Sequence, residues 1–179
     1  MRTPGLSDID QRMLLHGIAD QLNTIADQLP LADQIRADPA IGEILDDEVR
    51  NLARLLGYLA GESALRHRAA ARYPAQATPA QRRITLALAR AAKPTGGALA
   101  ALGSAVHDLG VLADLTHQAS GPDRHRAIAA AHQHLAVHFA KARSHLARAA
   151  QQLRRAADSR PTPPVAAPPS PQANPSRTR

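Results

Sequence analysis

The sequence predicts an all-α protein: a bundle of four or five long, largely antiparallel helices, followed by a disordered, proline-rich C-terminal tail. Apolar residues recur along the chain at spacings of three and four, which places them on one face of a helix. Proline, serine, threonine or aspartate marks the start of most of these segments. Alanine, the strongest helix former, supplies about half of the apolar residues.

The first predicted helix begins at Ser7, whose hydroxyl can cap a helix, and ends at Pro30. Its apolar stripe consists of Leu15, Ile18, Leu22, Ile25 and Leu29. The second begins at the Asp38-Pro39 pair, because proline is favoured in a first turn. It stops at Gly57 or Gly61 or continues towards Arg72. Its stripe consists of Ile41, Ile44, Leu45, Val49, Leu52, Leu55, Leu56 and Leu59.

A third helix is predicted from the Thr78-Pro79 pair to about Ala92. Residues 93–97 contain a proline and two glycines, which predicts a turn. A further helix then follows, with an apolar stripe of Leu99, Leu102, Val106, Leu109, Leu112 and Leu115.

Three glycines, Gly96, Gly103 and Gly110, lie seven residues apart along one side of that stripe. A glycine inside a helix costs about 1 kcal/mol relative to alanine. One interpretation is that another helix approaches closely along this side. The other is that Gly96 caps the helix and that the helix frays near Gly110.

The last predicted helix runs from about Asp123 to Asp158 and is on the order of 50 Å long. Large and small residues alternate along its stripe, as in tightly packed pairs of alanine-rich helices. This stripe consists of Ile128, Ala131, Leu135, Ala142, Leu146, Ala149 and Leu153, with Phe139 at one edge. The predicted organisation is therefore a flexible N-terminus (1–6), a helical bundle domain (7–158) and a disordered tail (159–179), in which proline removes backbone donors and fixes φ.

Charge is distributed unevenly along the chain. Residues 1–62 hold five Arg and eleven Asp or Glu, a net charge of −6, whereas residues 63–179 hold seventeen Lys or Arg and four Asp, a net charge of +13. This asymmetry indicates either a polyanionic partner for the basic half or pairing between the two halves. The N-terminus has no secretory signal, and the most apolar window, 96–106, is too short to span a bilayer. We therefore expect a cytoplasmic protein with no membrane partner.

The last predicted helix carries a basic stripe. Arg126, Lys141, Arg148 and Arg155 fall within roughly 60° of one another, opposite the apolar stripe. Contact with a phosphate backbone needs positive charge rather than base-reading groups, so these four residues form a candidate polyanion-binding site. The alternative is an ordinary solvated face. The acidic residues 43–48 would compete with nucleic acid for this stripe, because no nucleic acid could bind if they covered it in the folded bundle.

Histidines also gather on this helix, with His134, His138 and His145 on one side of the apolar stripe. An i,i+4 histidine pair can chelate a metal, but it would need ligands from another helix, for which the candidates are His107, Asp108 and His117. The alternatives are histidines at the edge of a bundle, or a pH-sensitive group. The prediction is no metal site and no cofactor.

Catalytic motifs are absent from the sequence, and the acidic triplet 46–48 is interpreted as surface. The sequence therefore predicts a non-enzymatic helical interaction or scaffold protein. Its partner would be a second copy or another helical protein, bound through the last helix. The alternative is a nucleic-acid-associated accessory protein that binds phosphates nonspecifically through its basic C-terminal helix. An enzyme with a metal in the bundle core ranks third.

Overall fold

The computed structural model describes residues 8–32, 35, 39–117 and 119–159, and this part of the chain is helical throughout except at the turns. The all-α prediction is confirmed. The predicted flexible N-terminus, the capping residue Ser7, the Asp38 start signal and nearly all of the proline-rich tail lie outside the described residues. The helices are α1 (Asp8–Gln28), α2 (Pro39–Arg72), α3 (Pro79–His117) and α4 (Pro122–Asp158), and a short 3-10 turn, η1 (Pro74–Gln76), joins α2 to α3.

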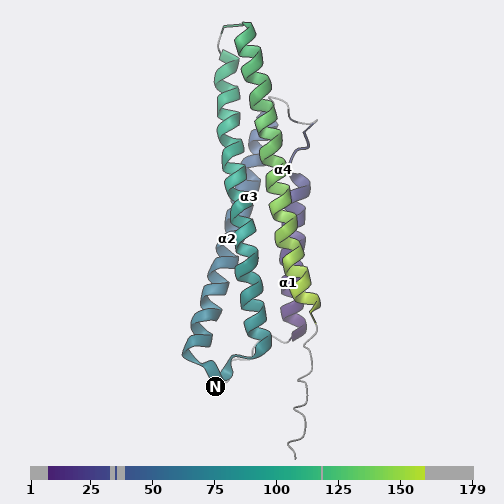
Figure 1. Ribbon diagram of the computed structural model, residues 1–179, viewed down its shortest axis with the longest axis vertical. Helices are drawn as coiled ribbons and strands as arrows, with labels where there is room; N and C mark the ends of the chain where they lie inside the picture. Colours follow the sequence, from purple (N-terminus) through teal and green to yellow (C-terminus); the bar gives the residue numbers. More distant parts are fainter. Residues whose placement is uncertain (1–7, 33–34, 36–38, 118, 160–179) are drawn as a thin grey trace, which may run out of the picture.

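The four helices pack in the order α1, α4, α3, α2, which differs from their order in the chain (Figure 1). Helix α4 packs against both α3 and α1, and α2 packs against α3. Helices α1 and α2 touch only lightly. The α3–α4 hairpin extends past the other helices at one end, and the α2–α3 hairpin does so at the other.

Short-range hydrogen bonds fix the two turns. Thr78 and Gln81 form a capping box at the start of α3, because the Thr78 hydroxyl accepts from the Gln81 N–H at 3.2 Å and the Gln81 side-chain oxygen accepts from the Thr78 N–H at 2.9 Å. This confirms the helix start predicted at Thr78-Pro79. At the other turn, the Arg124 Nε donates to the Leu115 carbonyl at 2.6 Å and so ties α4 to the end of α3.

The turn predicted at residues 93–97 is wrong, because α3 continues unbroken through it and Pro94 lies inside the helix. A proline in a helix interior removes one hydrogen bond and costs about 3 kcal/mol. That cost is offset because Pro94 and its neighbours Ala91, Thr95 and Ala98 are all buried along one continuous seam of α3. The Thr95 hydroxyl donates to the Ala91 carbonyl at 2.8 Å, so its burial leaves no donor unpaired. The bundle therefore has four long helices in its described part.

Neither interpretation of the glycine series holds. Gly96 is inside α3 rather than at its cap. A Cβ atom added there would lie 3.9 Å from Cδ2 of Leu56, which is an ordinary van der Waals distance. A Cβ atom added at Gly103 or Gly110 would meet nothing within 4 Å. The close approach occurs instead at Gly97, where a Cβ would lie 3.1 Å from Cε1 of the His145 ring on α4.

The apolar stripe of α4 forms the centre of the core. Leu135, Phe139, Leu146 and Leu153 are fully buried between α3 and α1, and the predicted stripe of α1 is buried as well. Phe139, which the sequence places at one edge of the stripe, is thus as fully buried as the leucines within it. The chain itself therefore covers the apolar stripe of α4, through which the sequence predicts contact with a partner, and only the opposite face of α4 is exposed.

Helix α3 is long and apolar enough to cross a membrane by length and composition alone, with a mean hydropathy of 1.4 over its best 18-residue window. The sequence-based estimate took the eleven residues 96–106 as the most apolar window, because His107 and Asp108 follow it, whereas α3 continues unbroken on both sides of that window. Within the bundle, 39% of this window is buried, and α3 packs between α2 and α4.

Candidate functional site

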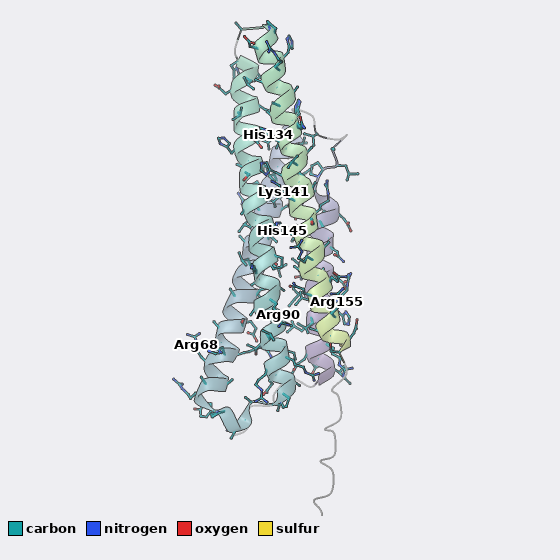
Figure 2. The ribbon with its side chains drawn as sticks, in the orientation of Figure 1. Arg68, Arg90, His134, Lys141, His145 and Arg155 are labelled. Carbon is teal, nitrogen blue, oxygen red and sulfur yellow. The ribbon has the colours of Figure 1, made fainter. Side chains whose placement is uncertain are left out.

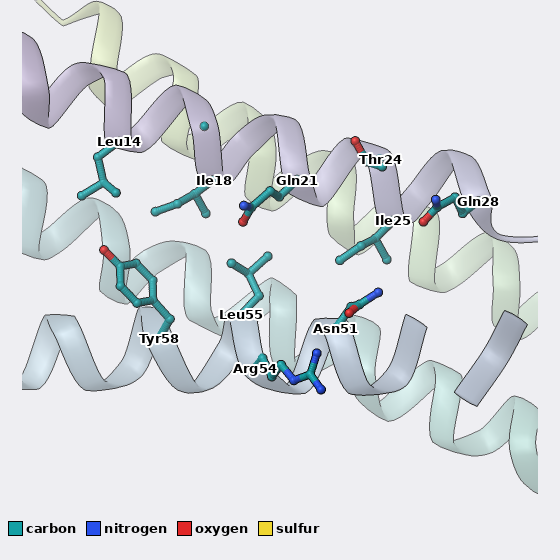
Figure 3. A pocket seen from close by; sticks show the side chains of 11 residues that line it. Leu14, Ile18, Gln21, Thr24, Ile25, Gln28, Asn51, Arg54, Leu55 and Tyr58 are labelled. Atoms are coloured by element: carbon teal, nitrogen blue, oxygen red, sulfur yellow. The ribbon is translucent and has the colours of Figure 1, made fainter. Parts of the chain in front are cut away.

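An open groove runs between α1 and α2, the two helices that scarcely touch. Its volume is about 810 Å³. Figure 3 shows Leu14, Ile18 and Ile25 of α1 facing Leu55 and Tyr58 of α2 across it. Ile18, Ile25 and Leu55 form a buried apolar floor. The rim is polar and consists of Gln21, Thr24, Gln28, Asn51 and Arg54.

The first two turns of α1 add an apolar patch next to this groove. Ile9 and Met13 lie one helical turn apart and are 69% and 67% exposed, more than any other large apolar side chain in the described residues. Gly17 follows Met13 by one further turn and lines the groove, where an added Cβ would meet nothing within 4 Å. The same helix therefore presents both an apolar patch and one wall of a groove.

The basic stripe of α4 is exposed along its whole length. Arg148 and Arg155 share a shallow hollow of about 660 Å³ with Arg154, and Asn23, Ser144 and Gln151 help to line it. Lys141 lies further along the same helix, as Figure 2 shows. Helix α4 thus brings Arg148 and Arg155 together and leaves Lys141 and Arg126 as separate exposed cations.

Carboxylates meet this stripe at its two ends. Arg126 pairs with Asp123 at 2.7 Å, but both side chains are so exposed that the pair contributes little. At the other end, Asp158 lines the hollow and lies 3.3 Å from the His16 ring of α1. Arg154 donates to Asp20 of α1 at 2.8 Å and so ties α1 to α4. Arg148, Arg155 and Lys141 have no carboxylate partner among the described residues.

The acidic residues 43–48 do not cover this stripe. They lie near the start of α2, which packs on α3 and has at most a marginal contact with α4. Asp46 is neutralised within its own helix by Arg50 at 2.7 Å. Among the described residues, the basic stripe therefore faces solvent rather than the acidic segment.

The triplet Asp46-Asp47-Glu48 is not a uniform acidic surface, because Glu48 is buried. Burial away from water raises the pKa of the Glu48 carboxyl, the nearby Asp47 carboxylate raises it further, and a hydrogen bond with the Asn51 side chain opposes the rise. Glu48 lies between Leu45 and Leu52 on the face of α2 that packs into the core. Its Oε2 atom has no hydrogen-bond partner, so it is a buried polar group at a position suited to leucine.

The histidines of α4 do not converge. His134 is exposed, whereas the His138 Nε2 lies 3.5 Å from the Asp108 carboxylate, and His145 packs against Gly97. Asp108 is thus the one residue of the suggested set that meets a histidine of α4. Across the described residues, no group of three or more His, Asp or Glu side chains is placed to hold a metal ion.

Comparisons with models of protein families, with curated proteins and with solved structures find no match to this chain. The candidate sites are therefore defined by their side chains alone. Sequence reasoning found the basic stripe because charge at helical spacing is visible along one helix. It missed the α1–α2 groove because that groove depends on which helices pack side by side, and the sequence carries no signal for this.

Proposed function

We propose that this chain is a non-enzymatic helical interaction protein and that a second copy of itself is its first partner. The observation that carries the proposal is the open apolar-floored groove between α1 and α2, with Ile9 and Met13 exposed on the helix that forms one wall. A two-fold contact uses the same surface on both subunits. Because the patch and the groove wall share one helix, a single two-fold contact would cover the Ile9–Met13 patch of both copies.

Sedimentation of the full chain from about 1 to 100 μM tests this proposal, over a range that covers ordinary protein–protein affinities. We expect a concentration-dependent dimer. Ile9→Ser combined with Met13→Ser should shift it to monomer, because both side chains are exposed and the change leaves the core intact. Gly17→Phe should do the same by filling the groove, since space is open at that position.

The matched control is Val106→Ser with Val137→Ser, which removes two exposed apolar side chains from the α3–α4 hairpin instead. This variant should keep the dimer. A wild-type chain that stays monomeric over the whole range would contradict self-association, and equal effects of the two double variants would contradict the proposed surface.

A second candidate function is nonspecific binding of a nucleic-acid backbone through Arg126, Lys141, Arg148 and Arg155. The observation that favours it is the packing of α2 on α3, which leaves the stripe clear of the acidic residues 43–48. Changing all four residues to Gln should reduce the slope of log affinity against log salt by up to about 0.9 for each phosphate that is no longer neutralised. Mobility shifts of duplex DNA in roughly 50 mM salt test it, and the absence of any shift would contradict it.

A further inference from the structure

The far end of the α2–α3 hairpin, residues 60–93, is a second basic surface that the proposed function does not use. The sequence has no acidic residue between Glu62 and Asp108, yet it has seven Arg or Lys in that interval. Arg66 pairs with Glu62 at 2.7 Å, and Arg82 donates to the Ala77 carbonyl at 2.8 Å. The other cations are exposed and have no carboxylate partner within the described residues: Arg68, Arg72, Arg83, Arg90 and Lys93.

This hairpin end also exposes large apolar side chains among its arginines. No residue between Leu59 and Ile84 is buried, because the two helices extend there beyond the cover of α1 and α4 (Figure 1). Leu65, Tyr73 and Leu86 are 56%, 53% and 48% exposed. Leu65 and Arg68 share one face of α2, and Leu86 lies between Arg83 and Arg90 on α3. Figure 2 shows the places of Arg68 and Arg90 on the two helices.

The tip itself carries no charge. Residues 73–81 contain no Asp, Glu, Lys or Arg, and they begin with Tyr73 and Pro74. The nearest cations, Arg72 and Arg82, come directly before and after this segment. The hairpin end is thus an uncharged tip with one aromatic ring, followed on both helices by exposed arginines and leucines.

We propose that this hairpin end docks on an anionic phospholipid surface, with Tyr73 and the uncharged tip entering the interface and Arg68, Arg72, Arg83 and Arg90 contacting the headgroups. Tyrosine is favoured at the boundary between water and acyl chains, and arginines reach outward to anionic headgroups. The sequence-based expectation of no membrane partner rested on the lack of a membrane-spanning segment. Peripheral docking on a membrane surface needs no such segment, so that expectation does not exclude it.

The mixture of charge and apolar surface favours lipid over the other polyanions and over a second copy. Contact with a phosphate backbone uses charge alone and would leave Leu65, Tyr73 and Leu86 in water. An anionic bilayer takes up both kinds of side chain. A second copy of the same end would bring unpaired arginines against arginines, which repel.

Flotation of the full chain with vesicles of phosphatidylcholine and roughly 30% phosphatidylserine tests the proposal. Wild type should bind these vesicles and should not bind pure phosphatidylcholine. Each basic residue near an anionic surface contributes about fivefold to binding. The variant Arg68→Gln, Arg72→Gln, Arg83→Gln, Arg90→Gln should therefore bind at least about a hundredfold more weakly, since removing three such residues already accounts for about 125-fold.

The control changes Arg126 and Lys141 of α4 to Gln, and it is compared with Arg72→Gln, Arg83→Gln, which removes the same number of charges. It should keep vesicle binding within roughly fivefold, because both residues lie far from the hairpin end along the bundle and are screened from a surface that this end contacts (Figures 1 and 2). Equal reductions in the two variants would overturn the proposal in favour of an effect of net charge. Binding of duplex DNA, but not of vesicles, through the hairpin arginines would overturn it in favour of nucleic acid.

Tyrosine emission gives a second readout that does not depend on the charge variants. The chain has no Trp and two Tyr, so Tyr58→Phe leaves Tyr73 as its one tyrosine. Brominated acyl chains in the anionic vesicles should quench Tyr73 in that variant. They should leave emission unchanged in Tyr73→Phe, whose remaining Tyr58 lies in the α1–α2 groove. Unquenched Tyr73 in vesicle-bound protein would overturn the insertion of the tip.

Discussion

Replacing Gly97 with alanine measures how tightly α3 and α4 approach each other. Alanine is favoured over glycine inside a helix by about 1 kcal/mol, so an unhindered Gly→Ala change in α3 stabilises the protein by up to that amount. At Gly97 the new Cβ would lie 3.1 Å from Cε1 and 3.2 Å from both nitrogens of the His145 ring. Normal contact lies several tenths of an ångström further out, so the ring must move.

The His145 ring is half-buried, and its Nδ1 atom is shielded from water, so a shift of the ring disturbs the packing of α4 on α3. Overpacking of this kind costs about 1 to 3 kcal/mol. We therefore expect Gly97→Ala to lower the free energy of unfolding by about 0 to 2 kcal/mol, since the helix-propensity gain offsets part of the cost. Gly103→Ala is the matched control and should raise it by up to about 1 kcal/mol, because its Cβ meets nothing within 4 Å.

Urea unfolding followed by circular dichroism separates these outcomes. In thermal unfolding, the midpoint temperature should change by about 2–4 °C for each kcal/mol of stability. In a His145→Ala background, Gly97→Ala should become stabilising, because the ring that it meets is gone. If Gly97→Ala stabilises the wild-type protein as much as Gly103→Ala does, the close approach of the two helices is refuted.

Three further changes test other parts of the structure. Glu48→Gln should stabilise the protein by on the order of 1 kcal/mol at pH 7, because it removes a buried ionisable group. A raised pKa means that the fold favours the protonated carboxyl of Glu48. Wild type should therefore lose stability relative to Glu48→Gln as the pH rises from about 4.5, the ordinary pKa of a glutamate, towards 7. A difference in unfolding free energy that does not change with pH would contradict this. Leu146→Ala should cost about 2–5 kcal/mol in urea unfolding because Leu146 is fully buried, and a cost below 1 kcal/mol would place it outside the core. Thr78→Ala should cost about 1 kcal/mol because it removes the capping box, whereas an unchanged unfolding midpoint would show that the cap is not needed.

The stripes of α1 and α4 could be predicted because their large apolar residues repeat at helical spacing and because proline separates them from their neighbours. Helix α3 could not be delimited, because local signals at Pro94 and Gly97 indicate a turn. The buried seam on which those residues lie consists largely of alanine, which the sequence also places on exposed faces. Tertiary burial therefore outweighs the local preference for a turn.

The candidate sites divide in the same way. The stripe of Arg126, Lys141, Arg148 and Arg155 belongs to one helix, so its spacing is readable from the chain. The α1–α2 groove combines helices whose side-by-side placement depends on the packing of α1 against α4 and of α2 against α3. The arginines of the hairpin end come from two helices, so the spacing along either helix alone does not bring them together.

The packing of α1 on α4 has a consequence for how the chain folds during synthesis. The hydrogen bond between Arg154 and Asp20 spans 134 residues, and that between Arg143 and Pro30 spans 113 residues. Helices α3 and α4 can each pack on the preceding helix as they emerge from the ribosome. Helix α1 emerges before the others, but α4, on which it packs, emerges after them. At a synthesis rate of about 5–20 residues per second, α4 is completed on the order of 10 s after α1. During that time the leucines and isoleucines of α1 are not yet buried by α4. Until α4 has emerged, the apolar stripe of α1 lacks most of the surface that buries it, so we expect α1 to dock no earlier than α4.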